Sequence, residues 1–377
     1  MELAELELHW NAHGEIDPLW AILSQADKRG NAWDEAEFFA AGVRQVEELF
    51  QRLDRLRIDR PSGPALDFGC GVGRLTQALL RHVERCVGVD IAASMVQRAE
   101  ACNRHGDRAR YVVNTREDLS LFAADTFGFI YSSIVLQHME PRYALGYIRE
   151  FVRVLRPGGL CVFQLPAGLR PAEEIAARFP EHVAFAPLPD EGCRAWIAVD
   201  PPPQPLAAGR RFTLPVRVRN TSSERWPQFG QPDTKYAIRL GNRWYDERGA
   251  HVEQFDERLF FDRSLEPGDE SRVNLAINAP HQPGRYLLEI DVAQEWVGWF
   301  SERGNRSACV GVEVAMPGND GDPAREQATF DPRIEMFAVS RDEVAATVAA
   351  AGGRVLHIED LCGRPTDLDY EYFITKP

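Results

Sequence analysis

The sequence predicts an α/β fold in which a parallel sheet is interrupted by an antiparallel β-sandwich, and three observations lead to this prediction. First, Ala65–Phe68 is a short apolar run followed by a glycine-rich turn and a helical apolar stripe, as expected of a buried strand that leads into a helix. Second, strand-like and helix-like segments alternate from there to about Pro166, which is typical of a parallel sheet. Third, from about Ala195 apolar and polar residues alternate one by one, as they do in half-buried antiparallel strands.

The first 168 residues are predicted to contain a helical segment and then most of the α/β domain. Residues 1–60 are expected to be helical because apolar residues recur at helical spacing after Asp17-Pro18. Residues 61–168 begin at the breaker Pro61–Pro64, and their last helix, from Tyr143 to Leu155, is expected to end in the turn Arg156–Gly159. The strands expected in this part are 65–68, 87–90, 110–113, 127–132 and 160–165.

Residues 190–318 are predicted to form the β-sandwich, of an immunoglobulin-like kind. About seven short segments of alternating apolar residues are separated by clusters of turn-forming residues. The alternation is clearest in 212–218, 273–277 and 286–292. The linker-like composition of Pro317–Pro323 marks the expected end of the sandwich.

Residues 331–377 return to the α/β pattern. Ser340–Glu343 forms a capping box before a helix, and strands are expected at 354–358 and 370–376. One helix and two strands could hardly bury a core alone, so we expect them to complete the first domain. The alternative is a tandem arrangement with an independent C-terminal tail.

The glycine turn carries the functional prediction. Gly69, Gly71 and Gly73 allow a sharp turn and a close approach of a ligand to the backbone. A second buried strand ends at Asp90, at the distance where a carboxylate accepts hydrogen bonds from ribose hydroxyls. The spacing is G-x-G-x-G, and Arg74 stands where a dinucleotide-binding loop has its third glycine, which disfavours an NAD enzyme. A plain glycine turn in an α/β domain is the remaining alternative.

Composition excludes several classes of function. The net charge of −14 and the absence of a Lys/Arg run argue against a nucleic-acid-binding protein. The seven cysteines are scattered without a C-x-x-C pair, so we expect neither a metal site nor a disulfide framework. No apolar run is long enough to span a membrane, and the first residues are acidic, unlike a signal peptide. We therefore expect a cytoplasmic protein.

These motifs resemble those of class I S-adenosylmethionine (SAM)-dependent methyltransferases. The resemblance rests on the first motif, Asp67–Gly73, on Asp90, and on the run Val154–Leu160 before the fifth strand. It implies a Rossmann-like sheet of seven strands with an antiparallel last strand. The sandwich is then an insertion between the fifth strand and the helix that follows it. The cofactor implied is SAM.

The resemblance also implies roles for individual residues. An acid at Asp67 suits the ammonium group of the cofactor, and Asp90 takes its ribose hydroxyls. Asn114, Thr115 and Arg116 are the nearest candidates for the adenine edge, because the acidic residue common near this position is missing. The full set expected to bind the cofactor is Asp67, Gly69, Cys70, Gly71, Gly73, Asp90, Ile91, Met95, Asn114, Thr115, Arg116 and Ser133.

The acceptor side is less defined. Trp33, Phe38 and Phe39 are candidates for lining its pocket, or else core of a helical pair. His138 is the candidate general base, with Gln137 beside it as a further pocket candidate; the alternative is a histidine that packs or binds substrate without proton transfer. We expect methyl transfer to oxygen of a small-molecule or glycan acceptor. The alternative is a non-catalytic SAM-binding scaffold, with the sandwich recruiting a partner protein or a second copy.

Overall fold

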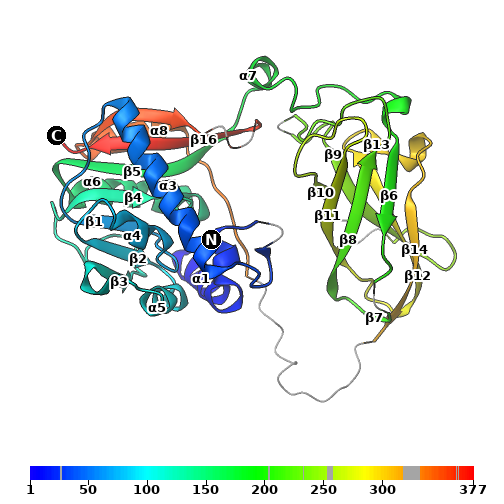
Figure 1. The fold of residues 1–377 in the computed structure, drawn as a ribbon, viewed down its shortest axis with the longest axis horizontal. Helices are drawn as coiled ribbons and strands as arrows, with labels where there is room; N and C mark the ends of the chain where they lie inside the picture. The colour runs from blue at the N-terminus through cyan, green and yellow to red at the C-terminus, as the bar shows by residue number, and fades with distance from the viewer. Residues whose placement is uncertain are drawn as a thin grey trace. The chain divides into compact units, whose positions relative to one another are not determined.

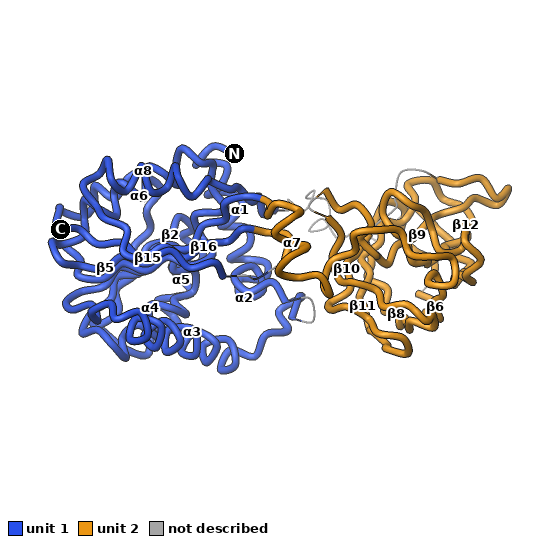
Figure 2. Tube along the Cα trace, turned by 90° about the horizontal axis from the view of Figure 1, so that it is seen from above, with its two compact units in different colours: residues 1–168, 328–363, 368–377 blue, residues 169–327, 364–367 orange. Residues whose placement is uncertain are grey.

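The structure is a computed structural model that describes every residue except 26–27, 203, 232, 253–257, 317–331, 362 and 364. Two compact units are present: residues 1–168, 328–363 and 368–377 form the first, and residues 169–327 and 364–367 the second (Figure 2). The first unit therefore consists of segments far apart in the sequence. The linker predicted at Pro317–Pro323 lies outside the described residues.

The first unit contains a seven-stranded sheet in the order β15-β16-β5-β4-β1-β2-β3 (Figure 1). Strand β1 lies between β2 and β4 and pairs with both in parallel, so the direction of winding reverses beside it. Strand β16 runs antiparallel to β15. This confirms the predicted fold class. The strands are β1 (Ala65–Phe68), β2 (Cys86–Asp90), β3 (Ala109–Val113), β4 (Phe127–Ser132), β5 (Leu155–Leu169), β15 (Arg354–Asp360) and β16 (Asp367–Thr375).

The fifth strand is longer than predicted. It begins at Leu155 rather than Leu160, so the expected turn Arg156–Gly159 belongs to the strand. The neighbouring C-terminal strand supplies partners for this backbone: Gly158 N–H donates to the carbonyl of Lys376 at 2.7 Å, and the Gly159 carbonyl accepts from the Thr375 hydroxyl. A contact between distant segments thus overrides the local turn signal.

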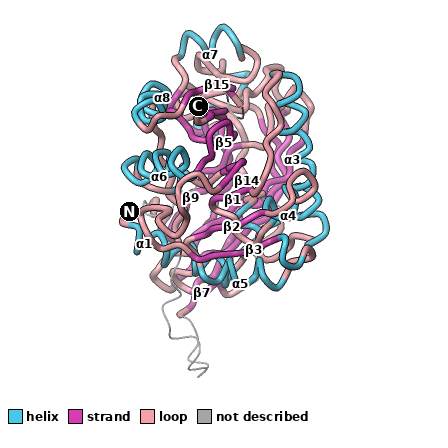
Figure 3. The backbone as a smooth tube through the Cα atoms, turned by 90° about the vertical axis from the view of Figure 1, so that its left-hand side faces the viewer, coloured by secondary structure: helices cyan, strands magenta, loops and turns pink. Residues whose placement is uncertain are grey.

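Helices cover both faces of this sheet (Figure 3). Because successive side chains of a strand point to opposite faces, Ile130 packs in one apolar cluster with α6 and α8, and Phe129 in another with α3 and α4. Helix α8 is capped by the Ser340 side chain, which accepts from the Glu343 N–H as predicted. The helices of this unit are α1 (Leu3–Ile16), α2 (Pro18–Ile22), α3 (Glu35–Leu56), α4 (Arg74–Leu79), α5 (Ala93–Ala101), α6 (Pro141–Val154) and α8 (Arg341–Ala350).

The second unit holds two sheets that enclose one apolar cluster. One sheet has the order β11-β8-β6, and the other has the order β10-β9-β12-β14-β7, with β13 paired to β12. Pairing is antiparallel except between β14 and β7. A short helix, α7 (Ala172–Arg178), precedes them. The strands are β6 (Ala195–Val199), β7 (Leu206–Ala207), β8 (Arg211–Asn220), β9 (Ile238–Asp246), β10 (Arg258–Phe260), β11 (Glu270–Asn278), β12 (Gly284–Gln294), β13 (Gly298–Trp299) and β14 (Ala308–Ala315).

No helix in the described part of the chain is both long enough and apolar enough to cross a membrane.

Candidate functional site

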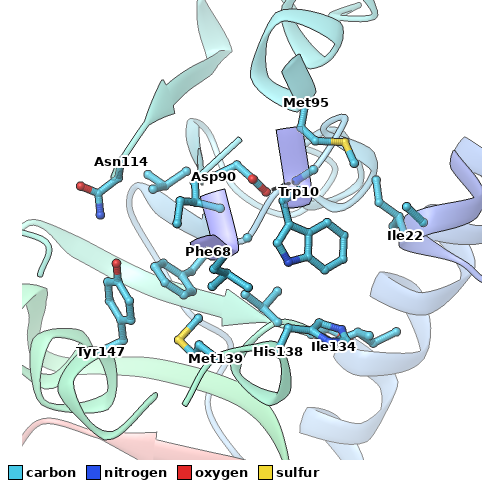
Figure 4. A pocket seen from close by; sticks show the side chains of 18 of the residues that line it. Trp10, Ile22, Phe68, Asp90, Met95, Asn114, Ile134, His138, Met139 and Tyr147 are labelled. Atoms are coloured by element: carbon cyan, nitrogen blue, oxygen red, sulfur yellow. Dashed lines mark hydrogen bonds between the residues drawn. The ribbon is translucent and has the colours of Figure 1, made fainter. Parts of the chain in front are cut away.

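A pocket that opens to solvent, which we call the cavity, has about 830 Å³ of free space when its open mouth is included, and it lies at the carboxyl ends of β1, β2 and β4 (Figure 4). This is the edge of the sheet at which the winding reverses, where open α/β sheets bind their ligands. Helices α1 and α2 contribute to its wall. The lining residues are Leu3, Leu6, Trp10, Ala21, Ile22, Phe68, Gly69, Gly71, Arg74, Val89, Asp90, Ile91, Met95, Asn114, Ser133, Ile134, Val135, His138, Met139 and Tyr147.

The turn after β1 forms one side of the cavity. Gly69 has φ of +76° and Gly71 has φ of +51°, a left-handed conformation that glycine adopts without strain. A Cβ at Gly69 would lie 2.3 Å from a methyl group of Val135, so glycine is also required there by space. Cys70 and Gly73 belong to the same turn but do not line the cavity.

Asp90 fixes the position of this turn. One carboxylate oxygen accepts from the Gly71 N–H at 2.8 Å, and the other accepts from the Ala92 N–H at 2.9 Å. Burial raises the pKa of Asp90, and these backbone hydrogen bonds oppose that rise. The carboxylate therefore stands at the end of β2 in one orientation, facing the cavity (Figure 4).

Asp67 does not line the cavity, although its predicted role is to bind the ammonium group of the cofactor. Its side chain is buried away from the cavity and accepts from the Thr76 hydroxyl at 2.6 Å. Burial raises its pKa from the ordinary 3.8 to about 6, although Thr76 and the nearby Arg74 favour the charged form. Asp67 thus joins β1 to α4 beneath the turn and does not reach the lining.

Three of the residues expected to bind the cofactor, Ile91, Met95 and Asn114, do line the cavity, whereas Thr115 and Arg116 do not. Asn114 is buried, and its amide nitrogen donates to the Asp118 carbonyl at 2.9 Å. Arg116 instead donates to the Ser120 hydroxyl at 3.0 Å. The amide of Asn114 is therefore the polar group that the loop after β3 offers.

His138 lies on the other side of the cavity, beside the ring of Trp10 (Figure 4). Its Nδ1 is 2.9 Å from the Glu335 carbonyl. A carbonyl only accepts, so Nδ1 carries the proton and Nε2 has the lone pair. Burial lowers the pKa of His138, which favours the neutral ring.

A chain of two glutamine amides reaches the same Nε2. The Gln164 amide nitrogen donates to Gln137 Oε1 at 2.9 Å and to Asp369 Oδ1 at 2.6 Å. Its oxygen accepts from the Ile134 N–H at 3.0 Å. The amide nitrogen of Gln137 is consequently turned toward His138 Nε2, at a long 3.3 Å. Gln137 acts on the cavity through His138 and is not itself part of the lining.

Comparison with known proteins agrees with this geometry. Residues 66–163 match the family model described as "Methyltransferase domain". Residues 66–163 thus form a methyltransferase domain.

Curated relatives match part of the chain, and two of them illustrate the range of their names. A carboxy-S-adenosyl-L-methionine synthase of Pseudomonas paraeruginosa is 30% identical over 137 residues, 33% of this chain and 53% of that protein. A ubiquinone biosynthesis O-methyltransferase of Xanthomonas oryzae is 30% identical over 111 residues, 29% of this chain and 46% of that protein. The chain thus spans about half the length of the curated relatives it matches.

A solved structure, an S-adenosylmethionine-dependent methyltransferase from Clostridium acetobutylicum, has a TM-score of 0.40 and 10% identity, covering 94% of this chain and 97% of that one.

The methyltransferase domain contains lining residues that the sequence analysis missed. Leu3, Leu6 and Trp10 come from α1, and Phe68 and Tyr147 come from β1 and α6. The spacing of Leu3, Leu6 and Trp10 is helical, but it does not show that this side of the helix faces a cavity. Ser133, which was predicted, lines the cavity and accepts a hydrogen bond from Gln45.

The three aromatic residues predicted for the acceptor pocket of the methyltransferase domain lie behind its wall. Trp33, Phe38 and Phe39 pack around the cluster that contains Val72 and Met95, and none of the three lines the cavity. The Trp33 indole donates to the Leu23 carbonyl at 3.1 Å. These rings support the cavity by packing, which was the alternative interpretation.

Ile134 is a conformational exception in the lining. It has φ of +61°, which is rare for a β-branched residue and costs on the order of 1–3 kcal/mol. Its side chain is nevertheless 40% exposed. The hydrogen bond to Gln164 holds this backbone in place at the end of β4. Among the described residues no group of three or more His, Cys, Asp or Glu side chains is arranged to hold a metal ion.

Proposed function

We propose that this protein transfers a methyl group from SAM to an oxygen atom of a small-molecule or glycan acceptor. The observation that supports the proposal is that a single cavity is lined by Gly69, Gly71, Asp90 and Asn114 on one side and by His138 on the other. When bound, SAM supplies a methyl group already activated by its sulfonium, so the protein has to orient the reactants and exclude water.

On the cofactor side, we assign binding to groups with a fixed orientation. Asp90 would accept the ribose hydroxyls, because its carboxylate is held by the Gly71 and Ala92 N–H groups. Ile91 and Met95 supply apolar surface for the adenine, and Asn114 supplies an amide at its edge. Asp67 is assigned a supporting role beneath the turn, because its carboxylate is bonded to Thr76.

On the acceptor side, His138 is the proposed general base. Its neutral ring has the proton on Nδ1, so Nε2 can take the proton of an acceptor hydroxyl as oxygen bonds to the methyl carbon. The hydroxyl has to replace the long contact from Gln137. The carbonyl of Glu335 then stabilises the imidazolium, because Nδ1–H still donates to it.

The proposal is tested in two steps on the full chain. Calorimetry with SAM measures cofactor binding in the wild type, in Asp90→Ala and in the surface control Asp107→Ala. Loss of a carboxylate that accepts two hydroxyls, at about 1.5–3 kcal/mol each, predicts binding at least about 100-fold weaker in Asp90→Ala alone. Equal affinity in all three proteins would remove Asp90 from the cofactor site.

The second step is mass spectrometry of metabolite and glycan extracts incubated with the protein and SAM labelled in its methyl group. Label in an ether product supports the proposal. Label in an N-methyl product would overturn the assignment to oxygen. Tight SAM binding without any labelled acceptor in any extract would favour a scaffold, and a carboxylated cofactor would indicate a reaction like the one named for the Pseudomonas relative.

A further inference from the structure

The outer face of the three-stranded sheet is basic, although the chain has a net charge of −14. In this sheet Leu214, Val216 and Val218 of β8 are buried in the sandwich core, so the residues between them face outward. Arg217 and Arg219 are exposed there, and Arg272 of β11 is exposed beside them. Glu270 is the one acidic residue within β6, β8 and β11.

Two of these arginines face each other without an ion-pair partner of their own among the described residues. The register places Arg217 directly opposite Arg272, and like charges in such a pair destabilise a sheet. Glu270 is committed to Arg219, at 2.9 Å. Its pKa is lowered first by that hydrogen bond and further by the charges of Arg217 and Arg272. Within the described residues neither Arg217 nor Arg272 forms an ion pair with a carboxylate.

An aromatic ring completes the face. Trp196 of β6 is opposite Arg219 and is 42% exposed. The guanidinium carbons of Arg217 and Arg219 lie 5.5 and 5.4 Å from the centre of its ring. The face therefore offers a flat ring, guanidinium groups and a net positive charge. We name the four residues Trp196, Arg217, Arg219 and Arg272 the arginine face.

We propose that the arginine face binds an acidic glycan whose sugars carry carboxylate groups. A guanidinium and a carboxylate form two parallel hydrogen bonds, and a carboxylate between Arg217 and Arg272 would cancel the repulsion that the free protein bears. The Trp196 ring gives a sugar ring a flat apolar surface. Thr213 and Asn274 are exposed on the same face beside Pro215, so it also offers polar groups to a hydrated sugar chain.

The proposal rests on the proposed function in one respect: a glycan held here would carry the hydroxyl that becomes methylated. Its test does not use SAM, so the two can fail separately. The probe is a galacturonic acid oligosaccharide, measured by calorimetry on the full chain at about 50 and about 300 mM NaCl. The higher salt concentration shortens the Debye length by a factor of about 2.5. Neutral dextran oligosaccharides, polyphosphate and poly-glutamate serve as comparison ligands.

The variant is Arg217→Gln with Arg272→Gln, and the matched control is Arg98→Gln with Arg110→Gln, two exposed arginines of the first unit. The proposal predicts that the variant binds the galacturonic acid oligosaccharide (the uronate) at least about tenfold more weakly than the wild type, and that the control variant binds it as tightly as the wild type. Wild-type binding should weaken at the higher salt concentration. SAM affinity of the variant should be unchanged, which shows that the first unit is intact.

The proposal is overturned if the wild type does not bind the uronate, or if the variant and the control bind it equally. Tighter binding of poly-glutamate than of the uronate would assign the face to an acidic peptide instead, and preference for polyphosphate would replace carboxylate by phosphate. Trp196→Ala separates the ring from the charges: it should weaken uronate binding and leave poly-glutamate binding nearly unchanged.

Discussion

The free energy of unfolding of Asp67→Asn, relative to that of the wild type, should increase as the pH rises from acidic to neutral. Asp67 is 1% exposed, and burial raises its pKa from 3.8 to about 6. Between these two values the folded protein holds a proton that the unfolded chain has released. The stability of the wild type therefore falls as pH rises through this window, and the full loss is present above about pH 6.

The magnitude follows from the shift of about two pKa units. At about 1.4 kcal/mol per unit, ionising Asp67 lowers the free energy of unfolding by about 3 kcal/mol. The asparagine of the variant is neutral at every pH and does not have this cost. Its amide has costs of its own, because Thr76 donates to the site, but those are present at every pH. The reasoning is therefore tested by how the difference in the free energy of unfolding between the two proteins changes with pH.

The assay is urea unfolding of the wild type and Asp67→Asn at about pH 4.5, 6 and 8, which span the window in which the carboxyl ionises. The variant should gain about 2 kcal/mol over the wild type between the lowest and the highest pH, because about a third of the full effect is already present at about pH 4.5, above the pKa of the unfolded chain. Asp107→Asn, at an exposed carboxylate, is the matched control and should show no such gain. A difference between wild type and Asp67→Asn that is flat with pH would refute the buried position of this carboxyl. A large loss of SAM affinity in Asp67→Asn would show that it reaches the cofactor.

Three further predictions concern other parts of the first unit. His138→Asn should lower kcat by about 100-fold or more while leaving SAM affinity unchanged. Because burial lowers the pKa of His138, the activity of the wild type should persist below the ordinary histidine range before it falls with acid, which a pH profile of kcat/KM measures. Arg52→Ala should cost about 3–5 kcal/mol, because it leaves the carboxylate of Glu371 buried without its partner at 2.8 Å. Burial already raises the pKa of Glu371 to about 7, so the loss should be larger at about pH 9 than at about pH 6, by urea unfolding. Trp10→Ala should weaken SAM binding by about tenfold or more by removing apolar lining, whereas Trp20→Ala, outside the lining, should not.

The strands of the sheet were predictable because their signal is local. Phe127–Ser132 coincides with β4 in full, since a strand buried on both faces is apolar throughout and is bounded by polar turns. The fifth strand shows the limit of this signal. Its start at Leu155 depends on the backbone of the C-terminal strand, which lies far later in the chain and includes Thr375.

The bounds and the buried face of helix α1 were not predicted, because apolar side chains of this helix are exposed and histidines are buried. Leu8 and Ile16 are 56% and 55% exposed, whereas His9 and His13 are buried. The apolar stripe that normally identifies a helix is therefore blurred. Helix α1 is held by contacts with another segment, since the Ser94 hydroxyl donates to the Asn11 carbonyl at 2.9 Å. Residues 1–16 alone could not show that they line the cavity.

The two acids of the predicted cofactor motif show what sequence spacing cannot decide. Asp67 and Asp90 each lie near the carboxyl end of a neighbouring parallel strand, and either could face a ligand. Asp90 is the last residue of β2, so its carboxylate reaches the Gly71 N–H across the turn. Asp67 pairs with Gly88, two residues before Asp90 in the register of the sheet, and there it meets the first turn of α4 and bonds to Thr76. Because side chains alternate with a period of two residues along a strand, both acids emerge on the same face of the sheet. They differ in depth along the strand: Asp90 ends β2 at the edge that opens to the cavity, whereas Asp67 lies deeper and is covered by α4.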